Sequence, residues 1–119
     1  MKLTEKLKPK RLDIYLADLP KQGGSIQYGY RPVIIIQNDR GNESSSTVIV
    51  IPLTGKLKYG QPTHVFIGTY TGIKRPSTAL CEQIQTITMN RLSRKIGEIT
   101  RESDILALHR AVNASIGLD

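Results

Sequence analysis

Cysteine and histidine are scarce in this chain: among its 119 residues, Cys81 is the only cysteine, and His64 and His109 are the only histidines. One cysteine cannot form a disulfide within the chain, and these side chains do not supply the Cys/His spacing of a zinc site. The carboxylates are not clustered in the sequence either, so we expect no metal and no cofactor. Cys81 lies in a strand-like run, where a lone cysteine usually packs as a small buried hydrophobe.

Long hydrophobic runs are also absent. The longest strictly apolar runs cover residues 33–36 and 48–51, whereas a membrane-spanning helix needs about 20 apolar residues. The lysine-rich start does not lead into an apolar stretch with a cleavage site, so no secretory signal is indicated. We therefore expect a cytoplasmic protein that does not bind membranes.

The composition is basic and typical of a folded domain. Lysine and arginine number 17 against 10 acidic residues, which gives a formal charge of +7 at pH 7. Hydrophobic residues make up 39% of the chain, too many for a disordered protein. The length matches one small domain. We predict a single domain over residues 1–119, with residues 1–10 as a flexible basic N-terminal arm.

Runs of apolar and β-branched residues predict strands over residues 12–17, 31–37, 47–54, 63–67, 78–87 and 95–99. Pro32 is expected at the start of the second strand, where its missing N–H matters least. The third strand is apolar on both faces and is therefore expected in the centre of the sheet. This order predicts a mainly β protein, a small barrel-like antiparallel sheet with a helix packed across it.

Helical periodicity is confined to the C-terminal segment. Thr100 is expected to cap this helix, whose apolar face comprises Ile105, Leu108, Val112 and Ile116. Residues 20–30 carry three glycines, one proline and no helical period. So long a loop is uncommon in a compact domain unless it has a function, so we expect it to belong to a binding site.

Basic residues and tyrosines occur together in and near the long loops: Lys21, Arg31, Arg40, Lys56, Lys58, Lys74 and Arg75, with Tyr28, Tyr30, Tyr59 and Tyr70. Single-stranded nucleic acid suits such a mixture, because cations contact phosphates and each base stacked on a ring contributes about 1–3 kcal/mol. Composition alone equally allows a basic domain whose tyrosines cover the sheet surface.

Arg31 and Thr54 are the residues best suited to phosphate chemistry. Arg31 follows the long loop and opens a buried strand, and Thr54 ends the next strand. If these strands pair antiparallel around the polar turn at residues 38–46, the two residues are neighbours. A guanidinium matches phosphoryl oxygens and stays charged, and a threonine hydroxyl can donate or accept a hydrogen bond.

Ordered matches along nearly the whole chain resemble the MazF/PemK/Kid family, the toxin endoribonucleases of type II toxin–antitoxin pairs. They include Asp13-Ile-Tyr-Leu-Ala-Asp-Leu, Gly24-Ser-Ile-Gln, Arg31-Pro-Val, Gln37-Asn-Asp, Pro52-Leu-Thr, Pro62-Thr-His-Val and Glu82-Gln-Ile. The resemblance implies an SH3-like barrel of the MazF/PemK/CcdB type that works as a homodimer. It also implies metal-independent cleavage of single-stranded mRNA at short sequences, and a cognate MazE-like antitoxin.

The resemblance places the family's catalytic residues on Arg31 and Thr54. We expect substrate contacts at Ser25, Gln27, Tyr28, Asn38, Lys56 and Gln83. RNA carries its own nucleophile, the 2′-OH, so the expected products are a 2′,3′-cyclic phosphate and a 5′-OH. The groups that move protons are left open, with His64 as a less favoured general base.

Two positions depart from the family pattern. Arg11-Leu-Asp stands where relatives have Arg-Gly-Asp, a change expected to concern packing or the barrel entrance. Ile26 stands where relatives often have glutamate, which leaves the cleavage sequence open. Two other functions stay open: an RNA-binding barrel without turnover, and a CcdB-like toxin that binds gyrase, against which the absence of tryptophan counts.

Overall fold

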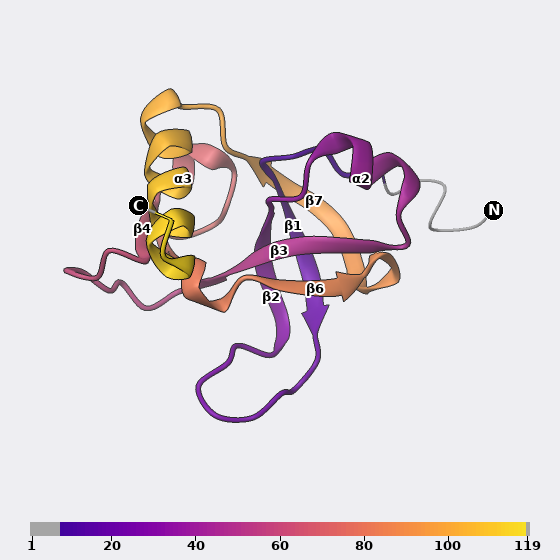
Figure 1. The fold of residues 1–119 in the computed structure, drawn as a ribbon, viewed down its shortest axis with the longest axis horizontal. Helices are drawn as coiled ribbons and strands as arrows, with labels where there is room; N and C mark the ends of the chain where they lie inside the picture. Colours follow the sequence, from indigo (N-terminus) through magenta and orange to yellow (C-terminus); the bar gives the residue numbers. More distant parts are fainter. Residues whose placement is uncertain (1–7, 119) are drawn as a thin grey trace.

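The computed structural model describes residues 8–118 and shows a curled antiparallel sheet with a long helix at the end of the chain (Figure 1). The strands are β1 (Asp13–Leu19), β2 (Gly29–Ile35), β3 (Thr47–Thr54), β4 (His64–Ile67), β5 (Ser77–Leu80), β6 (Gln85–Thr88) and β7 (Leu92–Glu98). The helices are α2 (Asp39–Ser44) and α3 (Glu102–Ile116), with 3-10 turns η1 (Thr69–Thr71), η2 (Cys81–Gln83) and η3 (Met89–Arg91). The expected mainly β, barrel-like fold with a C-terminal helix is confirmed.

Strand β3 is the centre of the sheet, as its apolar sequence predicts. The strands follow the order β4-β5-β3-β2-β1-β7, and β6 pairs with the first half of β3. Ile51 and Leu53 belong to one buried apolar cluster, whereas Val48 and Val50 belong to a second. Because side chains alternate between these two clusters, β3 is covered on both faces. This packing fixes the end of β3, and with it Thr54.

Helix α3 covers the first cluster, in which Leu108 and Ala111 are buried. Ile116, expected on the same face, is 57% exposed because the last turn extends beyond the buried part of the helix. The cap predicted at Thr100 is wrong. Arg101 takes the N-cap position without a side-chain cap bond, and its guanidinium lies 3.4 Å from the centroid of the Tyr70 ring.

Two glycines allow the two edges of the sheet to meet. η1 follows the edge strand β4, and it contacts β7 at the other edge through Gly72 and Gly97. A Cβ atom added to Gly72, whose φ is +111°, would lie 2.7 Å from the backbone oxygen of Ile96. A Cβ on Gly97 would collide with the backbone oxygen of Thr71. The barrel therefore closes by direct backbone contact.

Several predicted element boundaries are corrected by the structure. The second strand, predicted over residues 31–37, spans Gly29–Ile35, so Arg31 lies inside it and does not open it. The turn at residues 38–46 contains α2, because the Asn38 side chain accepts a hydrogen bond from Gly41 N at 2.8 Å and caps the helix. The strand predicted over residues 78–87 is interrupted by η2, and the last strand begins earlier, at Leu92. Pro32 lies inside β2, but the ladder with β3 begins only at Val33, so its missing N–H breaks no bond to β3.

Most of the expected N-terminal arm, residues 1–7, lies outside the described residues. The arm's last residues contact the barrel: Pro9 is buried, and Lys10 N donates to Asp13 Oδ2 at 2.9 Å. Within residues 8–118, no helix is long and apolar enough to cross a membrane.

Candidate functional site

The pairing of β2 with β3 brings Arg31 and Thr54 together. Val33 lies opposite Pro52 in this ladder, and the same register extended by two residues places Arg31 opposite Thr54. Both residues line one hollow of about 580 Å³, which we call the Arg31 groove. Its lining comprises Ser25, Gln27, Arg31, Thr54, Gly55, Lys56, Lys58 and Arg75.

A second hollow, of about 540 Å³, shares Arg31, Gly55 and Arg75 with the Arg31 groove. It adds further cations, Lys74, Arg94 and Lys95, above apolar residues that include Leu53 and Ile73. Neither lining contains Asp or Glu among the described residues. Such a concentration of positive charge favours a polyanion over a neutral ligand.

The Arg31 side chain is anchored at one nitrogen. Its Nε donates to the backbone oxygen of Tyr28 at 2.9 Å. Within the part of the chain described, no carboxylate lies in salt-bridge contact with its guanidinium. The two terminal nitrogens can therefore form paired hydrogen bonds to an anion such as phosphate.

Thr54 is only 5% exposed, at the floor of the groove. Its Oγ1 accepts a hydrogen bond from Lys56 N at 3.3 Å. A hydroxyl that accepts a bond in this way keeps its own hydrogen for donation. Thr54 can thus donate to a phosphoryl or leaving oxygen bound beside Arg31.

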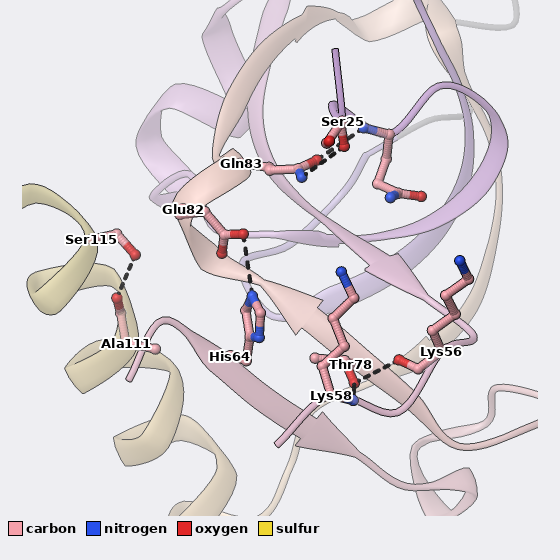
Figure 2. Close-up of polar contacts among 10 residues, drawn as sticks. Ser25, Lys56, Lys58, His64, Thr78, Glu82, Gln83, Ala111 and Ser115 are labelled. Atoms are coloured by element: carbon pink, nitrogen blue, oxygen red, sulfur yellow. Dashed lines mark hydrogen bonds and ion pairs between the residues drawn. The ribbon is translucent and has the colours of Figure 1, made fainter. Parts of the chain in front are cut away.

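Gln83 holds the long loop in place by both atoms of its amide. Gln27 N donates to Gln83 Oε1 at 2.9 Å, and Gln83 Nε2 donates to the Ser25 backbone oxygen at 3.1 Å (Figure 2). Gln22 forms a further bond to Gln85 at 3.0 Å. These bonds tie the loop to η2 and β6, so that Ser25 and Gln27 form one wall of the groove. Gln83 itself does not line the groove.

The remaining predicted residues lie outside the groove lining. Tyr28 is half-exposed, with Lys21 Nζ 5.3 Å from its ring centroid. Asn38 caps α2 beyond the other end of β2, and the structure does not bring it to the groove. His64 Nε2 lies 3.2 Å from Glu82 Oε2 (Figure 2) and is likewise absent from the lining.

Lys58 and Arg75 line the groove although the sequence indicates them only as members of a basic pattern. Their position depends on the pairing of β5 with the end of β3, where Thr78 lies opposite Thr54. That contact joins segments more than 20 residues apart, and no local sequence signal predicts it.

Cys81 is fully buried, and burial raises the pKa of its thiol to about 12, which is consistent with the packing role expected for it. Among residues 8–118, no three His, Cys, Asp or Glu side chains are grouped to hold a metal ion.

Comparison with known proteins gives consistent matches. Residues 10–116 match the family model described as "PemK-like, MazF-like toxin of type II toxin-antitoxin system". The Endoribonuclease MazF of Staphylococcus saprophyticus is 42% identical over 111 residues, which are 92% of each chain. The Mycobacterium tuberculosis toxin MazF-mt6 has a TM-score of 0.75 and 30% identity, over 90% of this chain and 98% of its own.

A mycobacterial endoribonuclease in complex with its cognate antitoxin has the same fold, with a TM-score of 0.77 and 24% identity over 93% of this chain and 97% of its own. The family match covers nearly all of the described barrel and includes every residue of the Arg31 groove. This chain therefore belongs to the PemK-like, MazF-like toxins of type II toxin–antitoxin systems.

Proposed function

We propose that this MazF-type endoribonuclease cleaves single-stranded RNA, in particular mRNA in the cytoplasm, at short sequences bound in the Arg31 groove. The observation that carries the proposal is the juxtaposition of Arg31 and Thr54 in a groove that, among residues 8–118, is lined by cations and by no carboxylate. The name of the staphylococcal relatives, Endoribonuclease MazF, supports the reaction class.

The reaction needs no external nucleophile. The 2′-oxygen of RNA loses its proton and attacks the adjacent phosphorus, the bond from phosphorus to the 5′-oxygen breaks, and that oxygen gains a proton. The products are a 2′,3′-cyclic phosphate and a 5′-OH. The Arg31 guanidinium stabilises the charge that develops on the phosphoryl oxygens, and Thr54 donates a hydrogen bond to them or to the leaving oxygen. We propose that no metal takes part.

Substrate contacts are assigned from the groove lining. Lys56, Lys58 and Arg75 bind neighbouring phosphates, and Ser25 and Gln27 present polar groups to the bases. The amide oxygen of Gln27 is buried and has no hydrogen-bond partner among the described residues, so a movement of the loop that exposes it would let it accept a bond from a base donor. Tyr28 can stack a base, and Gln83 contributes by holding the loop and, if the loop opens, by direct contact. Asn38 is left out of this set because it caps α2.

Incubation of a labelled single-stranded RNA with the protein in EDTA tests the proposal. We expect cleavage, with cyclic phosphate and 5′-OH ends. Retention of intact RNA would instead support an RNA-binding barrel, and the absence of both cleavage and binding would favour a gyrase-type target. Cleavage only after addition of a divalent cation would contradict the metal-independent mechanism.

A homodimer and an antitoxin belong to the same proposal. The family resemblance supports the dimer, and light scattering of the purified chain should give twice the mass of 13.2 kDa.

A related mycobacterial endoribonuclease forms a complex with its cognate antitoxin. Since the groove is basic, we propose a MazE-like antitoxin with an acidic segment that folds on binding and covers Arg31.

Hydrogen exchange of residues 20–31, with and without the antitoxin, tests this mode of inhibition. Occlusion predicts altered exchange in the loop and loss of RNA binding. Unchanged exchange together with unchanged RNA affinity in the complex would show that inhibition acts at a distance, for instance through the dimer contact.

A further inference from the structure

We propose that Thr78 is a positioning residue for RNA cleavage, which holds the Thr54 hydroxyl and the Lys56 and Lys58 cations in their working places. The inference rests on the proposed function of the Arg31 groove. Thr78 lies on β5 directly opposite Thr54, is 1% exposed and does not line the groove. It therefore acts through other residues and does not touch RNA.

The Thr78 hydroxyl is hydrogen-bonded both as donor and as acceptor to the turn that follows β3. Its Oγ1 donates to the Lys56 backbone oxygen at 2.9 Å and accepts from Lys58 N at 3.0 Å (Figure 2). Both bonds join segments at least 20 residues apart in sequence. They fasten residues 56–58 to β5, and with them the backbone that carries two of the groove's lysines.

The same turn contacts the hydroxyl assigned to phosphate chemistry. Lys56 N donates to Thr54 Oγ1 at 3.3 Å, while Lys56 O accepts from Thr78. Thr78 thus fixes the residue whose N–H occupies one acceptor position of Thr54. With that position occupied, the Thr54 hydrogen is left to point toward bound phosphate.

A valine at position 78 would keep the shape of threonine and remove both hydrogen bonds. The Lys56 carbonyl and the Lys58 N–H belong to exposed residues and would lose their partner on β5, so the turn would detach from β5 and form its hydrogen bonds with water. Its movement would displace the Lys56 N–H from Thr54 and both lysine side chains from the groove. A displacement of about 1 Å near reacting groups can cost up to about 100-fold in rate.

The experiment compares Thr78→Val, Thr78→Ser and Thr71→Val with the wild type. Thr71 is a matched control: it is also buried, its Oγ1 donates to the Gly68 oxygen at 2.8 Å, and it lies outside both hollows. Each variant is assayed for melting temperature, for kcat and KM on a labelled single-stranded RNA, and for the salt dependence of kcat/KM.

We expect Thr78→Val to lower kcat at least about tenfold and to flatten the salt dependence, by about 0.7 in log–log slope for each phosphate that the displaced lysines no longer bind. Thr78→Ser should restore both values, because it keeps the hydroxyl. Thr71→Val should lose stability but keep the wild-type kcat and salt slope. Amide exchange at Lys58 should be faster in Thr78→Val alone.

Wild-type kcat and salt slope in a folded Thr78→Val would overturn the inference, as would an equal loss of kcat in Thr71→Val. Arg31→Ala, assayed in parallel, separates the two proposals. If it is inactive while Thr78→Val is unaffected, only the role of Thr78 is wrong. If Arg31→Ala keeps the wild-type rate, the groove is not the site and both proposals fall.

Discussion

Leu12 has a φ of +77°, the left-handed backbone conformation that glycine adopts at little cost and other residues rarely adopt. Its N–H donates to the Ile35 oxygen at 2.7 Å, and its oxygen accepts from Ile99 N at 2.8 Å. These bonds connect the start of β1 with β2 and with the segment after β7. The departure from the family's glycine at this position therefore has a physical consequence: leucine must take a strained conformation to keep the two bonds.

Replacement of Leu12 tests this strain. Leu12→Gly and Leu12→Ala both remove the apolar side chain, but only glycine relieves the positive φ. We expect the glycine variant to be more stable than the alanine variant by about 1 kcal/mol, the reverse of the usual order. Urea denaturation of the two variants measures the difference. Greater stability of Leu12→Ala would show that the backbone at this position is not strained.

At the level of elements, the sequence predicts the positions of the strands and the pairing of strands that follow one another in the chain. Apolar runs locate the strands, and counting outward from the turn at residues 38–46 brings Arg31 to Thr54, because neighbouring strands share that turn. Helix α2 was not predicted, since its polar sequence also suits a turn and is ordered by the Asn38 cap. The pairing of β5 with β3 is not local, so the places of Arg75 and Thr78 were not predictable either.

Closure of the barrel depends on the absence of a side chain at Gly97. We expect Gly97→Ala to lower the free energy of unfolding by about 3 kcal/mol, because its Cβ would collide with the backbone of Thr71. Gly60→Ala is the control: its φ is +86°, with no atom within 4 Å of the added Cβ. It should lose only about 1 kcal/mol from backbone strain. Thermal or chemical unfolding of both variants measures these two losses of stability. A loss for Gly97→Ala no larger than for Gly60→Ala would contradict closure by backbone contact.

At the scale of the whole molecule, the chain has a net charge of +7, and part of its positive charge lies where the substrate is expected to bind. Four cations line the Arg31 groove, Arg31, Lys56, Lys58 and Arg75. If each binds one phosphate, log(kcat/KM) should fall with log[salt] at a slope of about −3, since single strands contribute about 0.7 for each phosphate bound. Cleavage assays across a range of salt concentrations measure this slope.

Two variants test whether the cations of the Arg31 groove cause this salt dependence. Lys58→Ala should reduce it by about 0.7, whereas Arg40→Ala, on α2 and outside both hollows, should leave it unchanged. A flat response between low and moderate salt, or an equal effect of the two variants, would show that RNA does not follow the Arg31 groove.

The rate of RNA cleavage by Arg31→Ala in EDTA tests the central claim most directly. We propose that Arg31 supplies charge to the reacting phosphate, and Arg31 is not part of either buried apolar cluster. Single-turnover assays of a labelled RNA should therefore show a loss of about 10²- to 10³-fold, with an unchanged melting temperature and with Arg40→Ala as active as the wild type. A folded Arg31→Ala that cleaves RNA at the wild-type rate would contradict the assignment of this groove as the active site.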